Sequence, residues 1–303
     1  MHYIRCSKRY LIFSLLSLVA LLGMLALGMS LLQHPGQAHA AGVGVASDGQ
    51  PFPLIGPKQH YLALGDSLAF GYQPCLLTNP PTCSTTDGYV NDLFTTLQNE
   101  GTKDVTNLGC PSESSITFIT GGICSYPHPF PSQLQAALAY LKANAGKVSP
   151  VTLDIGVNDV KPDLTITPTG CTVGPNFKSD LATLNNNLKD IILPQLQAAL
   201  TVTGRVTGSI VMMNYYNPFP NCLTNPDFAT DFTQFDTDLA TDVNGFGSIV
   251  DVFGAFGGIT TPNLCTDTWM CGNPPSPIGP DIHPRDPGYM LIADTFAAAL
   301  PAN

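Results

Sequence analysis

Several side chains suited to acyl transfer follow short apolar runs in this chain. Ser67 comes directly after Tyr61–Leu64, and Asn158 comes shortly after Val151–Ile155. A serine can attack an ester carbonyl when a base takes its proton. The negative oxygen that forms then needs hydrogen-bond donors such as a backbone N–H or an asparagine amide. His283, late in the chain, can serve as the base, so these residues predict a nucleophilic serine site. On its own, the Ser67 segment is equally compatible with a turn and a helix cap.

The surrounding sequence predicts the elements that would position these side chains. Strand-like runs are Tyr61–Leu64, Val105–Leu108, Val151–Ile155, Ser209–Met213 and Ile249–Val252. Helical patterns are Tyr89–Glu100, Gln133–Ala145, Asp180–Leu200 with a kink or break at Pro194, Asp227–Val243 and Pro287–Leu300. Alternating strands and helices predict a parallel sheet with helices on both faces. Ligands bind at the carboxyl ends of such strands. The long stretches there, rich in Pro, Gly and Cys, are expected to form the walls of a cleft: 71–88, 110–130, 160–178, 214–226 and 254–286.

The N-terminal region has the features of an export signal. Arg5, Lys8 and Arg9 precede the apolar run Leu11–Leu32, and Ala38-His39-Ala40 fits a cleavage site. We therefore expect a signal peptide over residues 1–40, a flexible tether over 41–58 and one catalytic domain over 59–303. The apolar run is also long enough to span a bilayer. A retained membrane anchor facing outside is thus the alternative to secretion.

The cysteines indicate an oxidising compartment. Nine occur in the chain, and Cys6 lies in the signal, which leaves an even number beyond it. Pairing of neighbours along the chain predicts the disulfides Cys75–Cys83, Cys110–Cys124, Cys171–Cys222 and Cys265–Cys271. Zinc binding is the competing role for cysteines, but the sequence has neither a C-x-x-C pair nor an H-E-x-x-H motif. We expect no metal site.

Composition and missing motifs narrow the function further. The formal net charge is −10 and no basic run occurs, which argues against a nucleic acid partner. No P-loop and no dinucleotide-binding glycine motif is present, so no cofactor is expected. Beyond the signal, glutamate occurs only as Glu100 and Glu113, which disfavours a glycosidase with paired glutamates. The G-x-S-x-G elbow of common α/β-hydrolases is also missing.

Four short stretches, in order, resemble the sequence blocks of the SGNH hydrolase superfamily, also called the GDSL lipase/esterase family. They are Gly65-Asp66-Ser67-Leu68, Asn107-Leu108-Gly109, Gly156-Val157-Asn158-Asp159 and His283-Pro284. The resemblance spans about residues 60–300. It implies a three-layer α/β/α sandwich, with a flavodoxin-like parallel five-stranded sheet in the order 2-1-3-4-5.

The resemblance also implies roles for individual residues. Ser67 would be the nucleophile and His283 the general base. The oxyanion hole would consist of the Ser67 N–H, the Gly109 N–H and the Asn158 side-chain amide. The family usually has an aspartate three residues before the histidine, but that position is Pro280 here, so Asp281 or a backbone carbonyl would orient His283.

A second departure from the family lies in the glycine block, where Ser112 stands at a position that often holds another glycine. Side chains that could line an acyl pocket are those of Tyr215, Tyr216, Phe253 and Trp269. The resemblance implies a serine esterase or lipase that acts on small-molecule or lipid esters. We expect it to be monomeric and, given the export signal and the cysteines, secreted. The alternatives are a carbohydrate deacetylase or an acyltransferase on the same fold, and a non-catalytic cell-surface binding protein.

Overall fold

A computed structural model describes residues 54–126, 130–167, 170–271, 276 and 279–302. The expected signal peptide and most of the expected tether lie outside these residues. His128, one of the three histidines that follow the expected signal peptide, also lies outside them. Within the described part of the chain, no helix has the length and apolar character needed to cross a membrane.

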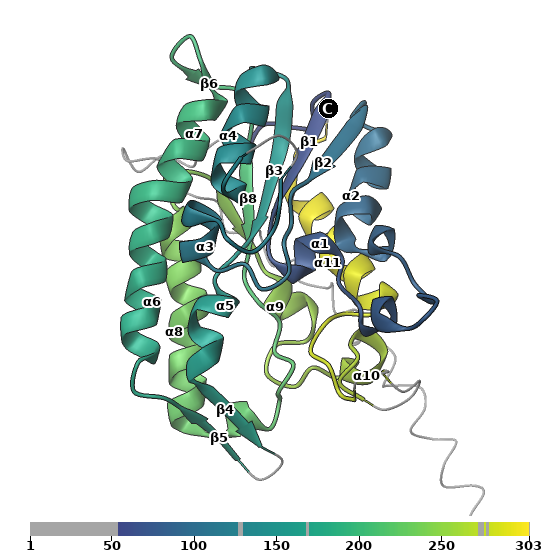
Figure 1. Cartoon of the computed structure of the whole chain (residues 1–303), viewed down its shortest axis with the longest axis vertical. Coiled ribbons are helices and arrows are strands. Elements are labelled where there is room, and N and C mark those ends of the chain that lie inside the picture. The colour runs from purple at the N-terminus through teal and green to yellow at the C-terminus, as the bar shows by residue number, and fades with distance from the viewer. Residues whose placement is uncertain (1–53, 127–129, 168–169, 272–275, 277–278, 303) are drawn as a thin grey trace, which may run out of the picture. The chain divides into compact units, whose positions relative to one another are not determined.

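A five-stranded parallel sheet forms the centre of the fold (Figure 1). Its strands are β1 (His60–Gly65), β2 (Asp104–Asn107), β3 (Val148–Asp154), β8 (Ile210–Met213) and β9 (Ser248–Val250). Their order is β2-β1-β3-β8-β9, and each neighbouring pair is parallel. Counting only these strands, the order is 2-1-3-4-5, so the predicted topology is confirmed.

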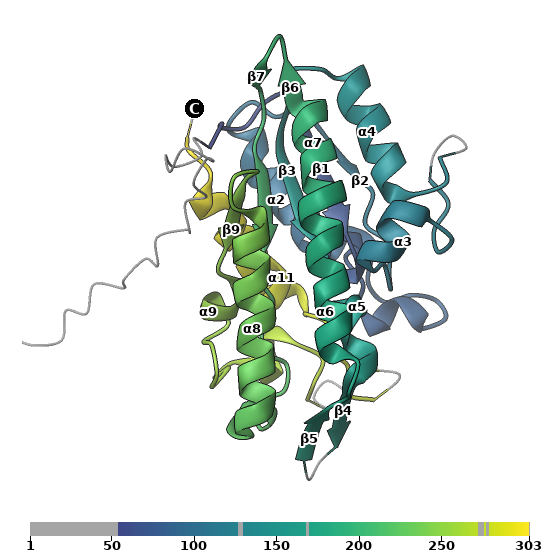
Figure 2. The same cartoon turned by 90° about the vertical axis from the view of Figure 1, so that its left-hand side faces the viewer.

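Helices cover both faces of this sheet. The α-helices are α1 (Ser67–Phe70), α2 (Tyr89–Gln98), α3 (Ser115–Thr120), α4 (Gln133–Ala143), α5 (Val157–Val160), α6 (Phe177–Asn186), α7 (Leu193–Leu200), α8 (Pro226–Val243), α9 (Val252–Ala255), α10 (Leu264–Asp267) and α11 (Asp286–Ala299). Figures 1 and 2 show α4, α6, α7 and α8 over one face, with α2 and α11 over the other. The predicted three-layer sandwich is therefore present.

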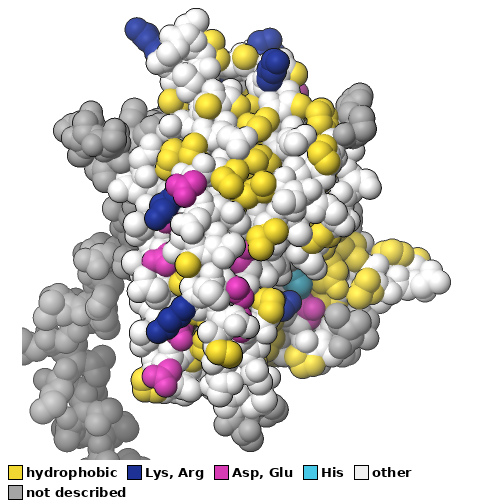
Figure 3. Space-filling view, turned by 60° about the vertical axis from the view of Figure 1, so that its left-hand side comes forward, with side chains coloured by type: hydrophobic (Ala, Val, Ile, Leu, Met, Phe, Trp, Pro, Cys, Tyr) yellow, Lys and Arg dark blue, Asp and Glu magenta, His cyan; other side chains and the backbone are white. Residues whose placement is uncertain are grey.

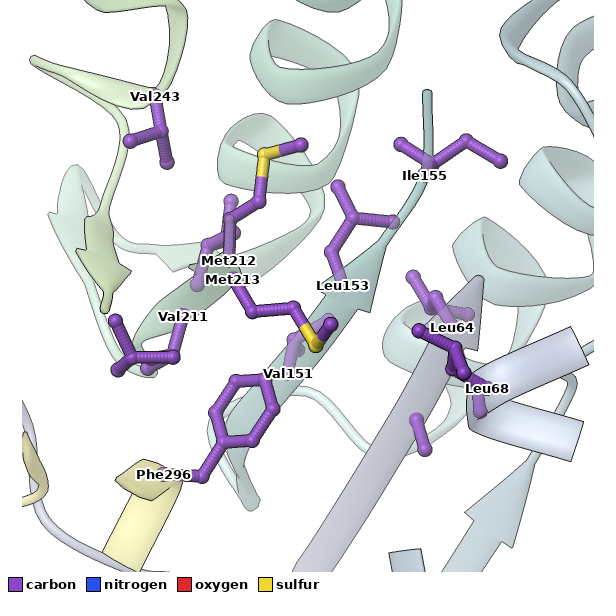
Figure 4. Close-up of a cluster of buried hydrophobic side chains, with 14 of the residues drawn as sticks. Leu64, Leu68, Val151, Leu153, Ile155, Val211, Met212, Met213, Val243 and Phe296 are labelled. Carbon is purple, nitrogen blue, oxygen red and sulfur yellow. The ribbon is translucent and has the colours of Figure 1, made fainter. Parts of the chain in front are cut away.

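The inner strands of the sheet are buried on both faces, whereas the edge strand β2 is partly exposed. All seven residues of β3 and all four of β8 are buried. Met212 and Met213 project to opposite faces of the sheet (Figure 4), as successive strand residues do. Phe296 of α11 and Val243 of α8 belong to the same buried cluster. Each such side chain contributes about 1.5–3 kcal/mol to folding, so the core holds the strand ends in fixed positions.

Pro194 divides the long helical segment, as the sequence predicted. Because proline lacks an N–H, it cannot make the regular helical hydrogen bond to the residue four before it. A π-helical stretch, Asn187–Ile192, separates α6 from α7 at this point. Insertions of this kind absorb a local break in the hydrogen-bond ladder.

The stretch 160–178, expected only to form part of a cleft wall, contains an antiparallel hairpin of β4 (Leu164–Thr167) and β5 (Gly170–Val173). It projects beyond the carboxyl ends of the central strands (Figure 1). A second small hairpin, β6 (Thr201–Val202) and β7 (Arg205–Val206), lies at the opposite end of the molecule (Figure 2). Short 3₁₀ helices occur at Pro74–Leu77, Thr85–Asp87, Lys161–Asp163 and Cys222–Thr224.

Four disulfide bonds join cysteines in the loops beyond the strand ends. The pairs are Cys75–Cys83, Cys110–Cys124, Cys171–Cys222 and Cys265–Cys271. These are the pairs expected from the sequence. Three of them close short loops, whereas Cys171–Cys222 spans 51 residues and connects β5 to the segment after β8.

Candidate active site

Ser67, His283 and Asp281 form one hydrogen-bonded chain at the carboxyl edge of the sheet. Ser67 Oγ lies 2.8 Å from His283 Nε2, and His283 Nδ1 lies 2.6 Å from Asp281 Oδ1. With Asp281 accepting a hydrogen bond from Nδ1–H, the neutral ring presents an unprotonated Nε2 to the serine hydroxyl. The structure thus brings together the three side chains expected to act as nucleophile, base and orienting acid.

The environment of Asp281 favours the ionised form of its carboxyl group. Burial alone would raise the pKa of its carboxyl group, but hydrogen bonds and charge from His283 together with the charge of Lys161 outweigh burial, so the pKa is lowered. A carboxylate here stabilises the positive charge that the imidazole gains when it takes the serine proton.

The loop that carries His283 is held on several sides. The Trp269 N–H donates to the His283 carbonyl at 3.0 Å, and the Tyr216 hydroxyl donates to the Ile282 carbonyl at 2.6 Å. The ring of Tyr72 lies 4.5 Å from the imidazole, centroid to centroid. These contacts fix the imidazole although it lies outside any regular element.

Ser67 is the first residue of α1, and the backbone before it is tightly constrained. Gly65 has a φ of +142°, and a Cβ at this position would overlap the Asp154 carboxylate. Asp66 caps the helix, because its Oδ1 accepts the Leu68 N–H at 2.9 Å. The strand-to-helix turn therefore places the serine hydroxyl at the edge of the sheet, as its sequence position predicted.

A buried polar network supports this turn from behind, and the sequence analysis missed it. Asp154 Oδ1 accepts the Asp66 N–H at 2.8 Å, and Asp154 Oδ2 accepts the Tyr89 hydroxyl at 2.6 Å. The Tyr215 hydroxyl donates to Asp66 Oδ2 at 3.0 Å. Burial raises the pKa of both carboxyl groups, and the charge of Asp66 adds to this for Asp154. An acidic residue at the end of an apolar strand was the one signal available in the sequence.

The expected oxyanion donors differ in their availability. The Ser67 N–H has no acceptor among the described residues. Asn158 Nδ2 donates to the Glu113 carbonyl at 2.9 Å and lies 3.5 Å from Asp66 Oδ2. These two groups border the serine hydroxyl from the β1 and β3 strand ends.

The Gly109 N–H, expected as an oxyanion donor, donates to Asn107 Oδ1 at 2.9 Å in this structure. The glycine has another use, because a Cβ here would overlap the backbone of Ala69 and Phe70 in α1. Gly109 therefore permits the close approach of the β2 loop to the nucleophile helix.

Ser112 follows in the same loop. It has a φ of +69°, in the left-handed region that glycine adopts most easily, which accounts for the glycine usual at this position in the family. Its N–H has no acceptor among the described residues, and the adjacent Glu113 carbonyl is the group bound by Asn158.

Asp159, next to the expected oxyanion residue, has a structural role. Its carboxylate accepts the Ser115 N–H at 2.8 Å and the Ser115 hydroxyl at 2.6 Å. Burial raises its pKa to about 6. It ties the loop containing Ser112 to α5.

A cavity of about 340 Å³ opens beside the serine and histidine. Tyr215 and Tyr216 contribute to its wall, whereas the other two expected pocket residues, Phe253 and Trp269, do not. Hydrophobic side chains gather beside a histidine, a cationic and an acidic side chain on the face shown in Figure 3.

Within the described ranges, no group of three or more His, Cys, Asp or Glu side chains could hold a metal ion. His60 lies at the start of β1, at the other end of the strand from Ser67, where its Nδ1 is 2.8 Å from Asp104 Oδ1.

Comparison with known proteins gives similarity at the level of structure. No protein-family model and no curated protein matches the chain. The acetylxylan esterase Axe2 from Geobacillus stearothermophilus matches with a TM-score of 0.52 at 18% identity, over 82% of this chain and 96% of that chain. The chain has the fold of this esterase.

Two lipase structures also share the fold of this chain at low sequence identity. A protein described as a GDSL-like lipase from Parabacteroides merdae matches with a TM-score of 0.52 at 17% identity, over 82% of this chain and 98% of that chain. The lipase Lip_vut3 from a goat rumen metagenome matches with a TM-score of 0.51 at 15% identity, over 79% and 96%. The SGNH-type α/β/α fold inferred from the four sequence blocks agrees with both.

Proposed function

We propose that this protein is a serine hydrolase of carboxylic esters, of the SGNH type. The observation that carries the proposal is the hydrogen-bonded chain from Ser67 Oγ through His283 to Asp281, with lengths of 2.8 and 2.6 Å. This arrangement supplies what an ester needs for cleavage through an acyl-enzyme. The fold shared with esterases and lipases is consistent with it.

In the first half-reaction, Ser67 Oγ attacks the ester carbonyl while His283 Nε2 takes the hydroxyl proton. The new C–O bond gives a tetrahedral intermediate, whose collapse breaks the bond to the alcohol. His283 returns the proton to the departing alcohol oxygen. In the second half-reaction, His283 takes a proton from water, the hydroxide attacks the acyl carbon, and Ser67 leaves with the proton from His283.

The developing oxyanion would be stabilised by the Ser67 N–H, the Asn158 amide and the Ser112 N–H, which replaces Gly109 in this role. Preorganised donors of this kind are worth about 3–4 kcal/mol each. Asn158 would exchange its hydrogen bond to the Glu113 carbonyl for one to substrate, or share it.

Two rival functions have less support. A non-catalytic binding protein would have no need for an intact Ser67–His283–Asp281 chain. A carbohydrate deacetylase or an acyltransferase would use the same nucleophile, and these differ from the proposed esterase in substrate or acceptor. The four disulfides and the signal-like N-terminus support secretion.

A fluorophosphonate probe tests the proposal directly. We expect it to label Ser67, and Ser67→Ala to lose nearly all hydrolysis of p-nitrophenyl butyrate while its circular dichroism stays native. The matched control is Ser179→Ala, which removes an exposed hydroxyl bonded only to the Asn176 carbonyl and should retain activity. If mass spectrometry places the label on another serine, the assignment is wrong.

A further inference from the structure

We propose that the acyl part of the substrate is an apolar chain of medium or greater length, held between the hairpin β4–β5, helix α8 and the segment after β8. The substrate class would then be fatty-acyl esters rather than acetyl esters of a sugar. This inference rests on the proposed function and specifies the substrate for the same site.

The 340 Å³ cavity at Ser67 is larger than an acetyl group needs, and its wall is mainly carbon. Leu164 and Ile166 of β4 line it together with Phe228 and Phe232 of α8. Pockets of this size with apolar walls bind apolar groups because burial removes both surfaces from water. An acyl chain attached to Ser67 would extend directly along these side chains.

Lys161, which is exposed, contributes a cation to the cavity lining, whereas both tyrosine hydroxyls at the wall are already engaged. The Tyr215 hydroxyl donates to Asp66, and the Tyr216 hydroxyl donates to the Ile282 carbonyl. Both tyrosines therefore present ring carbons to the cavity. A sugar would lose hydrogen bonds to water on entering such a wall, and polar groups left unpaired there weaken binding. The wall chemistry thus favours a hydrocarbon.

A second hollow of about 1030 Å³ shares part of this wall. Ile166, Pro218, Phe219 and Pro280 line both spaces. A chain too long for the first cavity can therefore continue past these four side chains.

The two hollows together form the acyl channel, whose walls include the hairpin β4–β5 and the segment after β8. Covalent and hydrogen-bonded links hold these two walls together. The disulfide Cys171–Cys222 joins β5 to the segment after β8, and Asn225 Nδ2 donates to the Cys171 carbonyl at 2.9 Å. Both cysteines pack with the buried Phe228. A wall fixed in this way needs little ordering when the chain binds, which favours affinity.

A series of p-nitrophenyl esters from acetyl to octanoyl tests the proposal. If each added methylene is buried, kcat/KM should rise by about fourfold per methylene, so the octanoyl ester should exceed the acetyl ester by at least about a hundredfold. Acetylated xylo-oligosaccharide is the competing substrate. A maximum at acetyl, or faster release of acetate from the oligosaccharide, would overturn the proposal. Labelling of Ser67 by diisopropyl fluorophosphate in the same sample would show that the proposed hydrolase chemistry survives that outcome.

Adjacent substitutions in β4 provide a matched test. The side chain of Ile166 is 37% exposed, so a charge there should be tolerated by the fold. Ile166→Glu should lower octanoyl kcat/KM at least about tenfold and lower acetyl kcat/KM by less, so that the octanoyl-to-acetyl ratio falls. Thr165→Glu puts the same charge on the other face of the strand and should change neither. An equal loss for both esters in Ile166→Glu would refute binding of the acyl chain at this wall.

Discussion

Asp281 contacts His283 twice through one carboxylate oxygen, at 2.6 Å from the ring Nδ1 and 2.9 Å from the backbone N. A side-chain oxygen that accepts the N–H two residues later forms an Asx turn. This turn folds the carboxylate back onto the imidazole of the same segment. It explains how an aspartate two residues before the histidine can orient it, although the family usually has the acid three residues before. Pro280 occupies that third position here.

Replacement of this acid tests its role. In the Ser-His-Asp protease template, the corresponding change from Asp to Asn lowers kcat about 10⁴-fold. We expect Asp281→Asn to lose several orders of magnitude in kcat with KM little changed, because the neutral amide no longer fixes the tautomer or stabilises the imidazolium. The exposed Asp227→Asn is the control for loss of a carboxylate. A loss below about tenfold would leave a Ser67–His283 dyad.

Asn158 provides a second test at the site. Asn158→Ala should reduce kcat by about 10²–10³, since the amide donor to the oxyanion is lost, and should affect KM less. The substitution also leaves the Glu113 carbonyl without its partner. Asn187→Ala therefore serves as a control, because it removes an amide donor to Ser115 that supports the same loop. Equal losses in the two variants would assign Asn158 to loop support.

The network behind the nucleophile yields a stability prediction. Burial raises the pKa of Asp154 well above its usual range, so a neutral side chain should replace it with little loss. Asp154→Asn keeps an acceptor for the Asp66 N–H and remains within reach of the Tyr89 hydroxyl. Asp154→Ala leaves the Tyr89 hydroxyl unpaired, at about 1–3 kcal/mol, and leaves the Asp66 N–H with only the backbone carbonyl of residue 154 as acceptor. Urea unfolding should show the alanine variant much less stable, and equal losses would mean that the charged form is the one the fold needs.

Asp236 should make stability depend on pH. Burial raises its pKa from 3.8 to about 7, with the charge of Asp251 adding to the rise and the hydrogen bond from the Tyr215 N–H opposing it. Between these two values the native state holds a proton that the unfolded chain has released. Stability contributed by this group is therefore present at low pH and falls as pH rises towards 7.

Asp236→Asn removes that titration. We expect its melting temperature to exceed that of the wild type at pH 8 by more than it does at pH 4, and a gain of about 1 kcal/mol would raise it by about 2–4 °C. The exposed Asp227→Asn, on the same helix, should follow the wild-type pH profile. A wild type and an Asp236→Asn variant with parallel profiles would contradict the prediction.

The sequence was informative where local pattern decides the structure. Short apolar runs predicted the five central strands, and the alternation with helices predicted that they are parallel. The strand order was implied by the resemblance to the SGNH hydrolase family. Ser67 and Asn158 follow strand ends directly, so their shared edge could be foreseen. The predicted strand Ile249–Val252 extends beyond the end of β9 at Val250. Asp251 caps α9 by accepting the Gly254 N–H, so the strand ends before Val252.

Contacts between distant or unpatterned residues could not be foreseen. The Gly109 N–H is taken by the Asn107 side chain, a choice of partner that residue type and spacing do not fix. Asp154 meets Tyr89 and Asp66 across 65 and 88 residues of sequence. The hairpin β4–β5 is rich in threonine and carries only Leu164 and Ile166 as a weak alternating signal, which is too short to separate from a loop.

The disulfide Cys171–Cys222 links stability to acyl-chain selectivity. In the chain-entropy account a cross-link stabilises more when it closes a longer loop. The sequence separation is 51 residues here and 8 for Cys75–Cys83, which corresponds to about 4 and 2.5 kcal/mol respectively. The double variant Cys171→Ala/Cys222→Ala should therefore lose more stability than Cys75→Ala/Cys83→Ala.

Selectivity separates the two variants further, because only the first pair holds the β4–β5 wall. The Cys171/Cys222 variant should lose most of the preference for octanoyl over acetyl esters, whereas the Cys75/Cys83 variant should keep it. Thiol titration of the denatured, unreduced wild type should find no free thiol, which verifies that both bonds exist before the comparison is made. If selectivity falls equally in both variants, the loss reflects general destabilisation, and the disulfide has no specific part in shaping the acyl channel.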